Sequence, residues 1–238
     1  MIKFFRKIRQ NLLNEGKTSK YFKYAIGEIF LVVIGILIAL QLNDWNDARK
    51  NQNYEQEILL LINQNLDNDS IVLTDRLKKS KQANILTDQL LEQVALGNYG
   101  DSLNYWMGKI ICFERFKSQS SAFEVLKSKG IETISNNELQ LALISYYDEV
   151  LYNVYQAFND VETSFKADWH PVIKQEFSDF KWREYCKPTD SKAFFETPSN
   201  LTFFKLYKDN RLGNVTNIEL ALEKISEIKK LSKTTKND

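Results

Sequence analysis

The chain has 238 residues, of which 32 are Lys or Arg and 31 are Asp or Glu, giving a formal net charge of +1. Eight Gly and three Pro are too few for the many turns of an all-β protein. The single histidine excludes metal sites built from several histidines.

The charge is distributed unevenly along the chain. Residues 1–23 contain seven Lys and Arg and one Glu, a net charge of +6, which leaves −5 for residues 24–238. This acidic body lacks the concentrated basic face that nucleic-acid binding requires, so we expect no nucleic-acid partner. The basic head mixes apolar and charged residues at helical spacing. It is either a short amphipathic helix lying on an anionic membrane surface or a plain basic flank.

The most informative stretch is residues 29–40, which is apolar throughout. A transmembrane helix needs about 20 residues to cross roughly 30 Å of hydrocarbon. The flanking residues extend the run to 24–43, where the polar Glu28 and Gln41 lie near the ends. We therefore predict a transmembrane helix over residues 24–43, in preference to the buried core helix of a soluble protein.

The orientation of this span follows from the charges around it. Basic residues close to a span mark its cytoplasmic side, and here they precede the apolar run. We therefore expect residues 1–23 in the cytoplasm, contact with membrane lipid, and residues 44–238 outside the cytoplasm. The location is then the inner (cytoplasmic) membrane with a periplasmic C-terminal domain. A cleavable signal peptide is the alternative, but the basic region is long and no small-x-small cleavage site follows, so we favour an uncleaved signal anchor.

One face of the predicted span carries small residues. On a helix, Glu28, Gly35, Ala39 and Leu42 share one side, and Gly35 and Ala39 form a small-x-x-x-small pair that lets two helices approach closely. This face predicts self-association into a homo-oligomer or docking to another membrane protein. Glu28 either contributes to that contact or ionises at the inner boundary.

The segment from residue 36 to residue 96 contains neither Gly nor Pro, and its apolar residues recur close to a period of 3.6. The pattern predicts that the membrane helix continues as a long helix. We expect one break, near residues 65–70 or 78–81, which folds the segment into an antiparallel pair. A turn follows at residues 97–101.

Further helices are expected over residues 103–116, 121–129, 136–165 and 201–231, the last with a possible split near residues 209–210. Gly130 suits the end of the second of these helices, and Ser135 with Glu138 forms a capping box at the start of the third. Residues 169–198 show no regular pattern. We therefore predict an all-α fold, in which an N-terminal transmembrane helix continues into an extramembrane antiparallel helical bundle.

Two blocks of sequence resemble a known family. The blocks cover residues 24–46 and 121–148, and they are similar to a family of uncharacterised membrane proteins found in Bacteroidota. The similarity extends over the whole length. It implies a single-span protein of unknown function, located in the inner membrane, and supplies no catalytic or ligand-binding residues.

The chemistry of the chain is sparse. No glycine-rich phosphate loop is present, and the acidic residues are spread over helix faces. We therefore expect no enzymatic activity, no cofactor, no metal and no identifiable small-molecule substrate. Cys112 and Cys186 allow one disulfide in an oxidising periplasm or two buried free thiols.

The aromatic stretch 169–195 is the best candidate for a recognition surface, with Trp169, His170, Trp182 and Tyr185 as its members. In the alternative interpretation these rings close one end of the bundle, and His170 is structural or solvated.

Three functions are compatible with the sequence. The first is a non-enzymatic, membrane-anchored helical bundle that acts as a protein-interaction or scaffold module. The second is a ligand-sensing periplasmic domain that works through a membrane partner, because about 23 cytoplasmic residues are too few for an output domain. The third is a hydrolase or transferase. We favour the first, since it accounts for the small-residue face and for the absence of catalytic groups.

Overall fold

The computed structural model describes residues 18–234, and most of them are helical. The chain divides into two compact units, Met1–Tyr54 and Glu55–Asp238. The all-α prediction is confirmed, with one two-stranded sheet added in the described part of the chain. The surface helix expected in the basic head falls on residues 1–17, which lie outside the described residues, as do residues 235–238 of the polar tail.

Helix α2 spans Thr18–Ala95 without interruption, so the break predicted near residues 65–70 or 78–81 is wrong. At the first of these places Asp69 is buried, and its carboxylate accepts hydrogen bonds from the hydroxyl groups of Ser118 and Tyr146. Because other segments satisfy this side chain, it does not compete with the backbone hydrogen bonds of α2.

The lysine-rich stretch 78–81 also remains helical, because two of its three lysines have acidic partners. The Nζ atom of Lys79 lies 2.7 Å from the carboxylate of Asp75, one turn earlier in α2. The Nζ atom of Lys81 lies 2.5 Å from the carboxylate of Glu219 in the neighbouring helix α9, Pro198–Thr234. These contacts replace like-charge repulsion with attraction along the helix surface.

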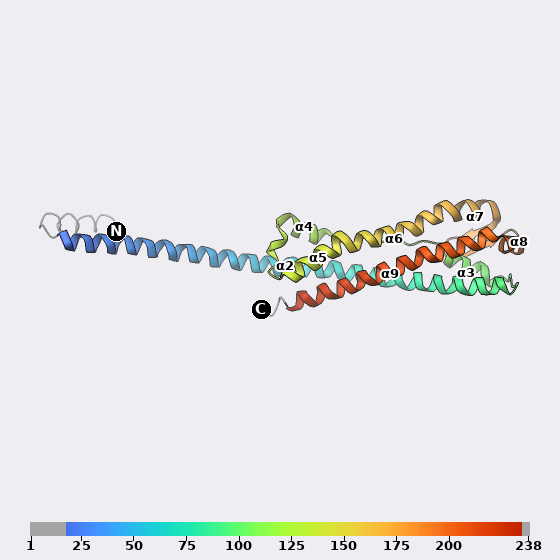
Figure 1. Cartoon of the computed structure of the whole chain (residues 1–238), viewed down its shortest axis with the longest axis horizontal. Coiled ribbons are helices and arrows are strands. Elements are labelled where there is room, and N and C mark those ends of the chain that lie inside the picture. Colours follow the sequence, from blue (N-terminus) through green and yellow to red (C-terminus); the bar gives the residue numbers. More distant parts are fainter. Residues whose placement is uncertain (1–17, 235–238) are drawn as a thin grey trace. The chain divides into compact units, whose positions relative to one another are not determined.

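Within the unit Glu55–Asp238, three long helical segments lie side by side (Figure 1). The first is residues 55–95 of α2, and the third is α9. The middle segment consists, in chain order, of α5 (Asn137–Ile144), the π-helical turn η2 (Ser145–Val150), α6 (Leu151–Ser164), the π-helical turn η3 (Phe165–Trp169) and α7 (His170–Glu176). The helix predicted over residues 136–165 is therefore present and extends eleven residues further.

Contacts between the segments fix their directions. Three ion pairs join α2 to α9, and their partners run in opposite order: Asp67–Lys229, Lys81–Glu219 and Asp88–Lys208. Helix α9 is therefore antiparallel to α2. The middle segment runs in the same direction as α2, since Tyr146 contacts Asp69 and, further along both helices, Val161 shares a core cluster with Leu86.

A parallel pair of helices needs a crossover connection, and residues 96–136 provide it. The connection contains α3 (Ser102–Ile110), an irregular stretch over residues 111–120 that we call the crossover segment, α4 (Ser121–Lys129) and the 3-10 turn η1 (Ile131–Thr133). The helix predicted over residues 103–116 ends at Ile110 because the crossover segment returns along α2. Glu114 pairs with Arg76, and the backbone N–H of Gln119 donates to Asp69.

Glycines end two helices as the sequence predicts. Gly97 follows α2 with φ of 73°, and Gly130 follows α4 with φ of 114°, both in the region that residues with a Cβ atom avoid. Beside Gly97, the N–H of Asn98 donates to the carbonyl of Gln93 at 2.9 Å, which closes the helix end.

The stretch after α7, predicted to be irregular, contains a hairpin and a short helix. Strands β1 (Phe177–Lys181) and β2 (Tyr185–Pro188) pair antiparallel, with Phe180 opposite Cys186 and a bulge near Phe177. Helix α8 (Ser191–Glu196) follows, and the Asp190 carboxylate caps it by accepting from the N–H of Ala193 at 3.0 Å. Aromatic residues here alternate too briefly to show a strand in the sequence.

Two local predictions need correction. The N-cap of α5 is Asn136, whose side chain accepts from two backbone N–H groups, whereas Ser135 donates its N–H and hydroxyl to the buried Glu55. Helix α9 is not split, because the Asn210 side chain donates to Ser164 of α6 at 2.6 Å and so bonds across the interface.

Asp69 provides a test of this architecture. Replacing it with Ala leaves the donors of Ser118, Gln119 and Tyr146 without their acceptor, and each unsatisfied buried group costs about 1–3 kcal/mol. We expect the free energy of unfolding to fall by about 2–4 kcal/mol, measured by urea denaturation of the full chain in mild detergent.

The matched control is Asp67→Ala, which removes an exposed ion pair with Lys229 and should cost less than about 1 kcal/mol. Equal effects of the two substitutions would contradict a structural role for Asp69.

Gly108 tests the packing of α3 on the hairpin. A Cβ atom at this position would lie 2.4 Å from backbone atoms of Glu184 and Tyr185, so Gly108→Ala should detach the hairpin or shift α3. The expected loss is on the order of 1–3 kcal/mol, as for overpacked cores. In Gly213→Ala, where a Cβ atom meets nothing within 4 Å, stability should rise by up to about 1 kcal/mol. The same denaturation assay measures both, and a neutral Gly108→Ala would refute the close approach.

Candidate functional site

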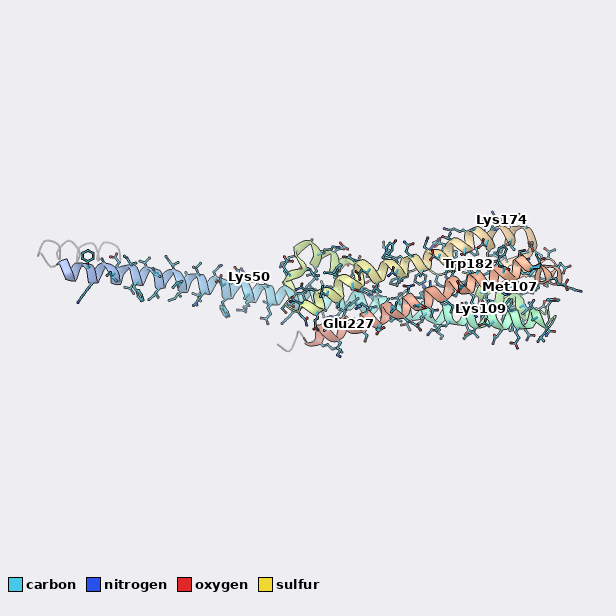
Figure 2. The ribbon with its side chains drawn as sticks, viewed as in Figure 1. Lys50, Met107, Lys109, Lys174, Trp182 and Glu227 are labelled. Carbon is cyan, nitrogen blue, oxygen red and sulfur yellow. The ribbon has the colours of Figure 1, made fainter. Side chains whose placement is uncertain are left out.

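A cavity of about 370 Å³ lies in the unit Glu55–Asp238, between α2, α3, the crossover segment, α6, the hairpin turn and α9. Ala83, Phe113 and Val161 contribute apolar lining from three different elements. Lysines and Gln82 from the outer side of α2, together with Lys109, are exposed to solvent and form its mouth. Figure 2 shows Lys109 and Trp182 at the hairpin end of this unit. The volume falls within the range of small-molecule pockets.

Arg211 of α9 is the central charged residue of this cavity. Its side chain is only 4 % exposed, and Nη2 donates to the carbonyl oxygens of Ile110 at 2.7 Å and Cys112 at 3.1 Å. The guanidinium stacks on the ring of Tyr207, 4.6 Å from its centroid. The other terminal nitrogen, Nη1, is buried and has no hydrogen-bond partner among the described residues.

Burial and the lack of a close counter-ion both act on this guanidinium. Desolvation lowers the pKa of Arg211, and Tyr207, Cys112 and Glu114 oppose this effect, with Glu114 the one carboxylate among them. Glu114 already pairs with Arg76 at 2.9 Å and Arg183 at 3.0 Å. No ion pair of Arg211 within 4 Å occurs in residues 18–234, so a buried positive charge is left without a direct partner.

The other charges at the cavity are also predominantly positive. Five basic side chains line it, and two acidic ones, Asp75 and Glu114. Asp75 is paired with Lys79, which holds the pKa of the carboxyl below its usual value. Lys78 and Lys109 have no ion pair in the part of the chain that the structure describes. The cavity therefore attracts anions.

Asn214 lies one turn after Arg211 and also lines the cavity. It is 2 % exposed, and its Oδ1 atom has no hydrogen-bond partner within the described range. An amide side chain presents either its oxygen or its NH₂ group after a half-turn, so Asn214 can donate or accept a hydrogen bond. Together with Arg211 it places two polar groups with unused hydrogen-bonding capacity on one face of α9.

Both cysteines are free thiols in the structure, which holds no bridge between Cys112 and Cys186. Of the two states that the sequence allows, the structure therefore has the unbridged one. Burial raises the pKa of Cys112, and it raises the pKa of Cys186 to about 12, so both remain protonated near neutral pH. Cys112 lines the cavity, whereas Cys186 belongs to the core cluster beside it.

The predicted recognition surface is not one surface. Trp169 is fully buried in the core, so its assignment to the surface is wrong, and its ring packs edge-on against Phe204 at 4.6 Å. Burying the large apolar ring of Trp169 in the core is more favourable than exposing it to water. His170 is exposed but does not line the cavity, and Tyr185 donates to Asp179 within the hairpin. Trp182, 37 % exposed, contributes indirectly by packing on Phe113 at 5.2 Å.

Sequence reasoning missed Arg211 and Asn214, although a signal for them exists. The buried residues of α9 recur at alternating steps of three and four, as at the a and d positions of a helical bundle. From Phe204 to Ile228 they are Phe204, Tyr207, Arg211, Asn214, Ile218, Ala221, Ile225 and Ile228, and the polar Asn200 and Ser232 continue the same spacing at the two ends. A charged residue and an amide within such an apolar series indicate a buried polar site.

The residues predicted to form a helix-packing face lie in the first unit. From residue 29 to residue 40 every residue of α2 is exposed, including Gly35 and Ala39. Leu42 is also exposed, Glu28 is half-buried, and a Cβ atom on Gly35 would meet nothing within 4 Å. Among the described residues, α2 is the one helix long and apolar enough to cross a membrane, judged by length and composition.

Comparison with known proteins adds one finding. No curated protein and no solved structure matches the chain. The model of a family of unknown function, DUF6090, matches residues 28–167, which include most of the predicted span and both blocks on which the resemblance was based, apart from residues 24–27. The match ends in η3, before the hairpin and α9, so it does not include Arg211. Since it covers more than half of the sequence, the chain belongs to the family of unknown function DUF6090.

Proposed function

We propose that the protein is a single-pass membrane protein whose helical domain acts as a non-enzymatic binding module outside the cytoplasm. The observation that carries this proposal is the continuous exposure of the apolar side chains over residues 29–40. Each large apolar side chain gains roughly 1.5–3 kcal/mol when it leaves water, so twelve consecutive exposed residues favour a lipid environment strongly.

The orientation in this proposal rests on charge. The +6 head over residues 1–23 stays in the cytoplasm, and the domain over residues 44–238 lies in the periplasm, as the positive-inside rule predicts. The inner membrane is the location that the resemblance to membrane proteins of Bacteroidota implies. Residues 24–43 then act as an uncleaved signal anchor.

Within the membrane, the face formed by Glu28, Gly35, Ala39 and Leu42 supports association with a second copy or with another membrane protein. Close approach of two helices depends on van der Waals packing, because lipid tails are as apolar as the side chains they would replace. Gly35 has no side chain and Ala39 has a single methyl group, so this side of the helix presents the flattest surface.

A second candidate function is ligand sensing by the domain through a membrane partner. The cavity at Arg211 specifically favours it, because a scaffold needs no buried and incompletely bonded cation. The two functions are compatible, since a ligand-binding domain on a membrane anchor also needs a partner to transmit its state.

The orientation can be tested by protease protection in spheroplasts of a cell that makes the full chain with an N-terminal epitope tag. We expect external protease to degrade the domain over residues 44–238 while leaving a short tagged fragment protected until the membrane is lysed. Cytoplasmic and periplasmic marker proteins serve as controls. A domain that resists protease until lysis would overturn the proposed orientation, and a chain released by carbonate washing would overturn the span.

The helix-packing face can be tested with two differently tagged copies of the chain, co-purified in mild detergent. Gly35→Leu fills the small-residue face, so we expect roughly tenfold weaker co-purification, equivalent to about 1.4 kcal/mol. Val33→Leu adds bulk on the opposite side of the same helix and should have no effect. If both variants behave like the wild type, and no other membrane protein is lost from the Gly35→Leu sample, this face forms no contact.

A further inference from the structure

We infer that the cavity at Arg211 is a binding site for a small organic anion, a carboxylate or phosphate ester carried on an apolar body. This inference rests on the second proposed function, ligand sensing, and names the chemical class of the ligand. Its starting point is a side chain that is 4 % exposed, lines the cavity and leaves Nη1 without a partner.

Comparison with other arginines of this domain shows that a buried guanidinium without a carboxylate partner is unusual here. Arg115 makes a two-pronged contact with Glu162, with Nε 2.8 Å from one carboxylate oxygen. Arg76 and Arg183 share Glu114. These three are more exposed than Arg211, yet each has a carboxylate partner. Because a buried guanidinium needs a counter-charge most, the missing carboxylate at Arg211 indicates that an external anion supplies it.

The surrounding charges support an anion and oppose a cation. Both acidic residues of the lining already have basic partners. Lys78 and Lys109 stand at the mouth with no ion pair among residues 18–234 and raise the local concentration of anions. Asn214 adds an NH₂ group that can donate to the same oxyanion beside Arg211.

The remaining lining selects the body of the ligand. Ala83, Phe113 and Val161 contribute apolar lining to the same cavity, so a free inorganic ion would leave this surface unused. A volume of about 370 Å³ lies near the lower end of the range for ligand pockets. The ligand is therefore a small molecule with a single compact apolar group, not a peptide or a polymer.

The test uses the full chain in detergent micelles with benzoate and phenyl phosphate as probes and with benzamide as the uncharged analogue. Binding is measured by calorimetry and, independently, by the rate at which iodoacetamide alkylates Cys112 at alkaline pH, where a larger share of this buried thiol is ionised, read by mass spectrometry. We expect both anions to bind saturably and to slow alkylation of Cys112, and benzamide to do neither. Arg211→Gln should weaken binding about ten- to hundredfold, the value of a hydrogen bond to a charged group.

The matched control is Lys208→Gln, which removes a positive charge from the same helix but lies outside the cavity and pairs with Asp88. It should bind like the wild type. If Arg211→Gln fails to fold, as judged by circular dichroism, Ala83→Leu fills the cavity while keeping the charge and should abolish protection of Cys112.

Absence of protection by either anion in the folded wild-type chain would overturn the inference, as would equal binding of benzamide. If inorganic phosphate binds as tightly as phenyl phosphate, the inference that the ligand carries an apolar body is wrong, because the apolar lining then adds nothing to the affinity. These outcomes are independent of the membrane experiments. A wrong orientation with intact anion binding refutes the anchor alone, and a correct orientation without anion binding refutes the ligand site alone.

Discussion

The crossover segment imposes the constraint on which the rest of the domain depends. Its backbone belongs to no helix or sheet, yet it runs between helices, so side chains must satisfy its polar groups. The helices and the hairpin turn supply them: Asp69 of α2 accepts from the N–H of Gln119, Tyr155 of α6 accepts from the N–H of Ser118, and Arg183 of the turn donates to the carbonyl of Phe113. The buried Asp69 is therefore a consequence of a parallel helix pair that needs a return path between its helices.

Arg211 belongs to the same set, and this explains both its position and its incompleteness. Its Nη2 atom serves the carbonyls of Ile110 and Cys112, where α3 ends and the crossover segment begins, and the Tyr207 hydroxyl assists at Cys112. These acceptors are neutral, so they satisfy hydrogen bonds without balancing a full charge. These backbone hydrogen bonds use one terminal nitrogen of the guanidinium, Nη2. The other terminal nitrogen, Nη1, is left without a partner among the described residues, and we propose that an anion bound in the cavity that Arg211 lines completes its hydrogen bonding.

The sequence was sufficient to predict the structure wherever a local pattern of residues determines it. The apolar run over residues 29–40, the 3.6-residue periodicity of the long helices and the glycines at residues 97 and 130 act through near neighbours, and all were predicted. It failed where distant residues decide. Asp69 keeps α2 continuous only because Ser118 and Tyr146 reach it, and Ser135 does not cap α5 because Glu55 takes its donors. The cavity is likewise assembled from six segments of the chain, so no window of sequence contains it.

Arg211 and Asn214 nevertheless interrupt an apolar series whose other members are almost completely buried. A leucine or isoleucine at either position would fit the spacing and remove the cost of a buried, unbalanced charge. A ligand that supplies the missing negative charge stabilises the folded state by RT ln(1 + [L]/Kd), since the site does not exist in the unfolded chain. Stability of the bundle and occupancy of the cavity are then linked quantities. A sensor domain requires such linkage, because its folded state must respond to the concentration of the ligand. A purely structural bundle would be more stable with apolar residues in place of Arg211 and Asn214.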